Sequence, residues 1–132
     1  MGILVYIIDE HTAVRRNLVR RLSATDKVQV VGDSGDALAA LRDLSALHPD
    51  VLLMEVKMRR ADGTDVCSRA AKLDDRLKVV VNTSYVDAEE RRRVQQAGGV
   101  AYLLKDLDIP GLVERLRALT EGQGLPADDR VV

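Results

Sequence analysis

The chain alternates short, uninterrupted apolar runs with longer segments in which apolar residues recur every three or four positions. A run that is apolar throughout is typical of a parallel strand covered on both faces, whereas the longer spacing is typical of an amphipathic helix. Strands are predicted at residues 3–8, 28–31, 51–54, 79–81 and 101–104. Helices are predicted at residues 12–24, 36–47, 64–73, 87–97 and 108–120.

This alternation predicts an α/β fold, with a single five-stranded, doubly wound parallel sheet. The runs at 28–31 and 101–104 are the least purely apolar, so we expect them nearest the sheet edges. Residues 1–120 are expected to form one domain. Residues 121–132 contain two Gly and one Pro, and are expected to be a C-terminal tail, either a frayed end or the start of a linker.

The predicted helices differ in what their sequences say about packing. Asp36 is expected to cap the second helix, whose apolar stripe is predicted to contain Leu38, Leu41 and Leu44. The fourth helix is polar and carries Glu89, Glu90 and the run Arg91–Arg93. It is expected to present a solvated face.

The composition excludes some classes of function. Charged residues make up 31% of the 132 residues, but the formal net charge is only −1. This balance gives no long-range attraction to polyanions, so we expect no direct nucleic-acid binding and no membrane association. No apolar stretch approaches the roughly 20 residues that span a bilayer. The single Cys cannot form an internal disulfide, which fits a cytoplasmic protein.

Polar groups follow the carboxyl ends of the predicted strands. Asp9 and Glu10 follow the first strand, Glu55 the third, Thr83 the fourth and Lys105 the fifth. Ligands of open α/β sheets bind at this edge, so we expect these side chains to converge. Three carboxylates repel one another unless a cation lies among them, and oxygen ligands of this kind favour Mg²⁺. Because Thr83 and Lys105 could bind phosphoryl oxygens, the set indicates phosphoryl transfer or a permanently charged copy of it.

The order and spacing of these groups resemble the receiver domain of response regulators in two-component signalling. The matching stretches are IIDEH (7–11), VLLMEVKMRRADG (51–63), VVVNTSY (79–85) and AYLLKD (101–106). The resemblance covers roughly residues 3–119 and implies the flavodoxin-like receiver fold. The stretch AYLLKD and the opening DEH are most similar to the class with a LuxR-type helix-turn-helix output. A function in phosphorelay signalling is implied, with control of transcription through a fused or partner output domain.

By this resemblance, the carboxylate edge of the sheet would be a phosphorylation site. Glu55 falls on the phosphoacceptor position. Asp9, Glu10 and Glu55, together with the backbone carbonyl of Lys57, would be the ligands of a Mg²⁺ ion.

The same resemblance implies a switch and a set of partners. Thr83 falls on the switch hydroxyl, Tyr102 on the switch aromatic and Lys105 on the phosphate-binding lysine. In the family's mechanism, phosphorylation draws the hydroxyl and the aromatic inward and remodels the face of the fourth helix, fifth strand and fifth helix. The implied partners are a sensor histidine kinase or another signalling protein, and a second copy of the chain in a homodimer.

The sequence departs from the family pattern at two positions. The family's acceptor is Asp, and the extra methylene of Glu55 displaces the carboxylate by about 1.5 Å. Displacements near 1 Å can cost on the order of 100-fold in rate, so Glu55 is expected to make the domain phosphorylation-independent or phosphomimetic. Its carboxylate is expected to reach toward Lys105 or Thr83. Arg59 replaces the usual Pro, which restores an N–H and is expected to loosen the loop.

Several alternatives remain open at this stage. Glu55 is either a natural divergence, which Arg59 favours, or an engineered substitution. The chain could be a stand-alone, phosphate-independent protein-interaction module. It could also be an aspartyl phosphatase-like enzyme of the same fold with Asp9 as nucleophile. Such enzymes have a second Asp two residues later, whereas this chain has His11. We therefore expect a signalling module and not an enzyme.

Overall fold

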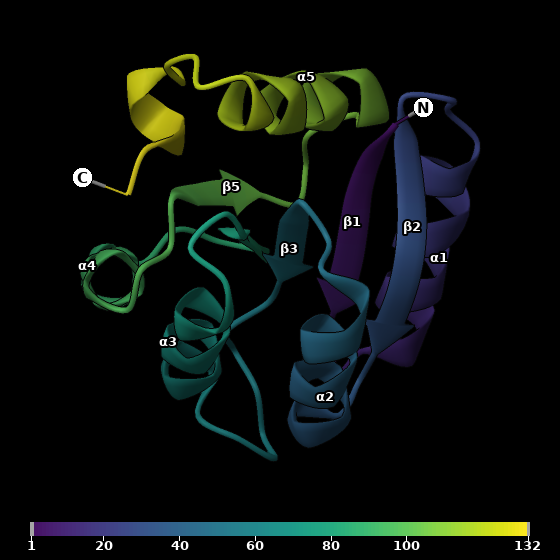
Figure 1. The fold of residues 1–132 in the computed structure, drawn as a ribbon. Helices are drawn as coiled ribbons and strands as arrows, with labels where there is room; N and C mark the ends of the chain where they lie inside the picture. The colour runs from purple at the N-terminus through teal and green to yellow at the C-terminus, as the bar shows by residue number, and fades with distance from the viewer. Residues whose placement is uncertain (1, 132) are drawn as a thin grey trace.

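The computed structural model describes residues 2–131 and shows a parallel sheet with helices on both faces (Figure 1). The strands are β1 (Ile3–Ile8), β2 (Val28–Ser34), β3 (Val51–Met54), β4 (Lys78–Thr83) and β5 (Ala101–Leu104). The helices are α1 (Thr12–Ser23), α2 (Ala37–Leu47), α3 (Gly63–Leu73), α4 (Ala88–Gln96), α5 (Ile109–Thr120) and a short 3-10 helix, η1 (Ala127–Asp129). Met1 and Val132, the outer ends of the predicted domain and tail, lie outside the described residues.

The sheet has the strand order β2-β1-β3-β4-β5, with every neighbouring pair parallel. This confirms the doubly wound fold and places β2 and β5 at the edges, as predicted. The chain changes direction across the sheet between β1 and β3, and Ile8 there pairs in register with Met54. The residues that follow these two strands therefore leave the sheet side by side, at the point where doubly wound folds bind ligands.

The core consists of two apolar layers, one on each face of the sheet. Successive strand residues point to opposite faces, so Tyr6 packs with α2, α3 and α4 whereas Ile7 packs with α1 and α5. Both faces of the central strands are therefore covered by helices. Continuous hydrophobicity in β3 and β4 follows from this double coverage.

The second helix begins where the sequence predicted, and Leu41 and Leu44 of the predicted stripe pack against the core, but Leu38 does not. Asp36 accepts hydrogen bonds from the N–H groups of Leu38 at 2.9 Å and Ala39 at 3.4 Å, which confirms the N-cap. Leu38 is 69% exposed, however, and the buried stripe contains Ala40 and Leu44. Residues two positions apart in a helix differ by about 200° in direction, so Leu38 points away from the face that buries Ala40.

The described part of the tail packs on the domain and is not frayed, while its role as the start of a linker stays a prediction. Leu125 and Val131 are buried against the domain, and Asp129 forms an ion pair with Arg115 of α5 at 2.9 Å. In Figure 1 this segment, drawn in yellow, turns back from the end of α5 toward α4. No helix among residues 2–131 combines the length and the hydropathy needed to cross a bilayer.

Candidate functional site

The candidate site lies at the carboxyl ends of β1, β3, β4 and β5. The backbone brings these ends together, because the N–H of Glu55 donates to the carbonyl of Ile8 at 3.1 Å and that of Lys105 to the carbonyl of Thr83 at 2.7 Å. Asp9, Glu55 and Thr83 are all buried, with 5%, 6% and 0% of their surface exposed. Charged groups this deep must be paired to be tolerated.

Lys105 supplies the positive charge for two of the predicted carboxylates. Its Nζ lies 2.9 Å from Oδ2 of Asp9 and 3.2 Å from Oε1 of Glu55. Two buried carboxylates near each other repel, and an ammonium that pairs with both offsets that repulsion. Lys105 therefore joins β1, β3 and β5 through one ion-pair cluster. The cavity beside these three side chains is about 10 Å³, room for about one water molecule.

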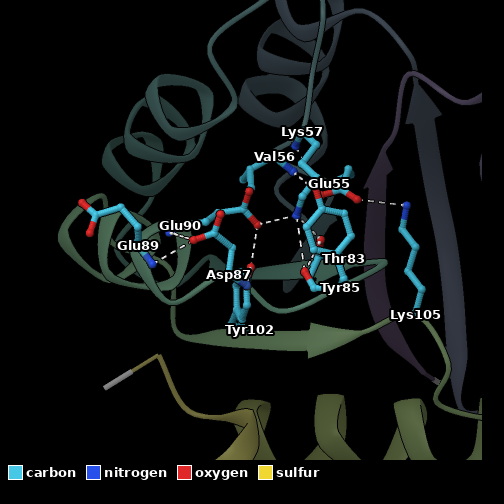
Figure 2. A network of polar contacts seen from close by, with 10 residues as sticks. All are labelled: Glu55, Val56, Lys57, Thr83, Tyr85, Asp87, Glu89, Glu90, Tyr102 and Lys105. Carbon is cyan, nitrogen blue, oxygen red and sulfur yellow. Dashed lines mark hydrogen bonds and ion pairs between the residues drawn. The ribbon is translucent and has the colours of Figure 1, made fainter.

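Both oxygens of the Glu55 carboxylate are occupied. Oε1 faces Lys105, and Oε2 accepts the N–H groups of Val56 at 2.9 Å and Lys57 at 3.2 Å. Of the two directions expected for this longer side chain, the structure shows the one toward Lys105 (Figure 2). The hydroxyl of Thr83 is bonded elsewhere.

Glu10 is turned away from the other acidic side chains. Its two carboxylate oxygens accept the N–H groups of Arg59 at 2.7 Å and Arg60 at 2.9 Å. These hydrogen bonds lower the pKa of Glu10 below its ordinary value. Proline has no N–H, so the bond at position 59 depends on the departure from the family pattern. The loop expected to be loose is instead tied to Glu10.

The side chains expected to bind Mg²⁺ contact other groups of the protein. Within residues 2–131 there is no group of three or more His, Cys, Asp or Glu side chains placed to hold a metal ion. Asp9 and Glu55 face an ammonium, and Glu10 faces the loop. The side chains as they lie do not fit a cation held by three carboxylates. The assignment of Asp9, Glu10, Glu55 and Lys57 as Mg²⁺ ligands stays a prediction.

A second polar cluster lies beside the first, and the sequence did not reveal it. The Nζ of Lys57 donates to Oγ1 of Thr83 at 2.6 Å and to Oε1 of Glu90 at 2.8 Å. It also lies 4.4 Å from the centre of the Tyr85 ring. The sequence indicated a role only for the backbone carbonyl of Lys57. Its side chain contacts a residue 33 positions away, which no local pattern signals.

Tyr102 joins this cluster from β5. Its side chain is 1% exposed, and its hydroxyl donates to Oε1 of Glu90 at 2.6 Å and accepts the N–H of Asp87 at 3.2 Å. Burial and the hydrogen bond to Glu90 raise the pKa of Tyr102. Glu90 itself is buried, so the prediction of a solvated face is wrong at this position of α4. In the sequence, the signal for Glu90 was its position three residues after Asp87, the N-cap of α4.

An open parallel sheet with an acidic pair, a further carboxylate, a hydroxyl and a lysine at its carboxyl ends defines a signalling receiver domain. A model of the response regulator receiver domain matches residues 5–117. The chain therefore belongs to the family of response regulator receiver domains, as the sequence motifs predicted.

Individual relatives agree with this family. The transcriptional regulatory protein LiaR of Bacillus subtilis is 31% identical over 121 residues, which are 92% of this chain and 57% of that protein. The response regulator VraR of Staphylococcus epidermidis is 29% identical over 125 residues, which are 95% of this chain and 60% of that protein. The chain thus spans a little over half the length of these relatives.

A solved structure extends the similarity to three dimensions. The signal receiver domain of the response regulator NarL from Mycobacterium tuberculosis superposes with a TM-score of 0.82 at 28% identity. The match covers 92% of this chain and 98% of that domain. This supports the predicted similarity to receivers of the LuxR-type class and confirms the flavodoxin-like receiver fold.

Proposed function

We propose that this chain is a receiver module whose conformation is set without phosphorylation of residue 55, and that it controls transcription through a fused or partner output domain. The observation that carries the proposal is the bridging position of Glu55. One carboxylate oxygen pairs with Lys105, and the other accepts two backbone N–H groups. Each charge and each hydrogen-bond acceptor of this side chain is thus already engaged.

This position makes Glu55 a poor phosphoacceptor. Phosphoryl transfer needs an attacking oxygen in line with the leaving group, and it relies on positioning much more than on covalent chemistry. The longer side chain displaces the carboxylate by about 1.5 Å from where an aspartate would hold it. A misplacement near 1 Å can cost on the order of 100-fold in rate. An incoming phosphodonor would also have to break the ion pair with Lys105.

The same ion pair supports a phosphomimetic state. A glutamate carries a permanent negative charge in contact with Lys105, although it has less charge and fewer acceptor oxygens than a phosphoryl group. The Tyr102 side chain is buried, and its hydroxyl donates to Glu90. An inward aromatic accompanies phosphorylation in the mechanism that the family resemblance implies. We infer that Glu55 biases the two-state equilibrium toward this inward state.

The proposed protein partners are inferred from the family and from the surface of α4, β5 and α5, next to Tyr102. We infer a cytoplasmic partnership with a sensor histidine kinase or another signalling protein, and homodimerisation through α4, β5 and α5. LiaR is a transcriptional regulatory protein of which this chain matches 57%. An output function at the level of transcription is accordingly part of the proposal.

The phosphatase alternative gains no support among the described residues. Oδ2 of Asp9 is paired with Lys105, and Oδ1 accepts the N–H of His11 at 2.9 Å. Position 11 offers an imidazole on an exposed side chain and no second carboxylate. Asp9 is held as a structural anion in this arrangement.

The proposal is tested by incubating three proteins with acetyl phosphate and Mg²⁺ and weighing them intact by mass spectrometry. These are the wild type, Glu55→Asp and the control Glu114→Asp, which shortens an exposed glutamate of α5. We expect only Glu55→Asp to gain a phosphoryl group. A phosphorylated wild type would contradict the proposal. If none of the three gains one, the phosphate-independent interaction module replaces the phosphate-switch account.

A further inference from the structure

The side-chain ammonium of Lys57 connects three elements of the fold. It extends from the loop after β3 and contacts Thr83 at the end of β4, Tyr85 in the following loop and Glu90 in α4 (Figure 2). The lysine side chain is 27% exposed, and that of Glu90 only 9%. The ion pair is therefore largely shielded from water. Coulomb attraction between the two charges is stronger in this environment than on the open surface.

The buried carboxylate of Glu90 accepts hydrogen bonds from two side chains. A buried carboxylate is costly unless it is paired and hydrogen-bonded. Its partners are Lys57 at 2.8 Å and the hydroxyl of Tyr102 at 2.6 Å, and both reach the same oxygen, Oε1. One atom thus couples the position of the lysine ammonium to the position of the tyrosine hydroxyl.

Thr83 is held by the same ammonium. Its Oγ1 accepts from Lys57 at 2.6 Å and donates to the carbonyl of Tyr85 at 3.3 Å. The residue predicted as the switch hydroxyl is consequently fixed by a lysine from the β3–α3 loop. A single cation therefore holds the predicted hydroxyl and, through Glu90, the predicted aromatic.

We propose that Lys57 is a positioning residue, a built-in cation that holds the Thr83 hydroxyl and, through Glu90, the buried Tyr102 in place together, independently of phosphorylation at residue 55. The inference rests on the proposed function and assigns its regulation to a residue outside the family's switch pair. Removal of the ammonium would leave Glu90 as a buried, unpaired charge. The carboxylate would then turn toward water and withdraw the acceptor that holds the Tyr102 hydroxyl.

The tyrosines themselves provide the test. The chain has three Tyr, no Trp and no Phe, so 3-fluorotyrosine labelling gives one ¹⁹F signal for each tyrosine. Tyr6 is an internal reference, because its hydroxyl donates to Asp43 of α2 and not to the Lys57 cluster. We expect Lys57→Met to shift or broaden the Tyr102 signal beyond its line width while Tyr6 stays in place. Lys57→Arg, which keeps a cation, should retain a Tyr102 signal close to that of the wild type.

The matched control is Lys72→Met, which removes an exposed lysine of α3 and should leave all three signals unchanged. An unchanged Tyr102 signal in folded Lys57→Met would overturn the inference. If that variant does not fold, Lys57→Gln removes the cation but keeps a polar side chain, and an unchanged Tyr102 signal in that variant would overturn the inference equally. The spectra are recorded without a phosphodonor, so their outcome is independent of whether residue 55 can be phosphorylated.

Discussion

Glu10 shows at the scale of one residue how this receiver departs from its family. The N–H of Arg59, absent where the family has Pro, donates to the Glu10 carboxylate together with the N–H of Arg60. These bonds stabilise the ionised form of Glu10 and draw it toward the loop. The two departures from the family pattern therefore act on different carboxylates of the predicted metal site, since Glu55 pairs with Lys105 and Glu10 is bonded to the loop.

The titration of Glu10 tests this relation. Its pKa in the folded chain is lowered, chiefly by the hydrogen bond from Arg59, so this contribution to stability is full above the ordinary glutamate pKa of 4.5. It is lost as the pH falls through the lower folded-state pKa. We expect the ¹³C carboxyl signal of Glu10 to titrate below 4.5 and Arg59→Pro to raise that midpoint.

The control for this titration is Arg59→Ala, which changes the side chain but keeps the N–H. It should titrate close to the wild type. Equal midpoints for the wild type and Arg59→Pro would show that the hydrogen bond from residue 59 does not control Glu10.

At the scale of single elements, the sequence predicted most of the fold. The bounds of β1, β3 and β5 agree with the predicted runs, because strands covered on both faces are apolar throughout. β2 runs three residues further than predicted. Its end is polar, but it is an edge strand, and Asp33 and Ser34 still pair with Ile7 and Ile8 of β1. Backbone pairing continues there without an apolar signal.

The N-cap of α2 gives a prediction at this scale. Asp36 satisfies the N–H groups of Leu38 and Ala39, which have no partner within the helix. We expect Asp36→Ala to lower the free energy of unfolding by about 1 kcal/mol, measured by urea titration. Asp75→Ala, at an exposed aspartate between α3 and β4, is the control and should change stability by less than about 0.5 kcal/mol. Equal stabilities of the two variants would argue against the cap.

At the scale of the whole molecule, the tail completes the surface around β5. Leu125 joins the layer beneath α5, and Val131 joins the layer that contains Tyr102. Arg91 of α4 donates to the carbonyl of Asp128 and stacks on the Tyr102 ring, 5.4 Å from its centre. The tail therefore contacts the same side chains that the predicted switch would move.

Substitution of the buried tail leucine tests this packing. Leu125→Ala should lower the free energy of unfolding by about 2 kcal/mol, near the lower end for buried leucines because a terminal segment can settle around the gap. The control Leu38→Ala removes the same atoms from a residue that is 69% exposed and should cost less than about 0.5 kcal/mol. Urea unfolding of both variants gives the comparison. Equal losses would mean that the tail does not pack as described.

The site was predictable only in part, and the reason lies in the whole fold. Strand ends can be predicted from apolar runs, so the sequence indicated that Asp9, Glu55 and Lys105 would meet, and the structure brings them together. The contact between Lys57 and Glu90 depends on the distance between a loop and a helix. No periodicity encodes that distance. The roles predicted for Thr83, Tyr102 and the acidic pair stay predictions.

The central claim is that the conformation of this receiver is set without phosphorylation. It is tested most directly by amide NMR spectra of the wild type before and after addition of acetyl phosphate and Mg²⁺, with Glu55→Asp measured in parallel. The account predicts no phosphodonor-dependent change at Thr83, Tyr102 or Lys105 in the wild type, and clear changes at these residues in Glu55→Asp. Wild-type signals at these residues that move on addition of acetyl phosphate, but not of Mg²⁺ alone, would contradict it.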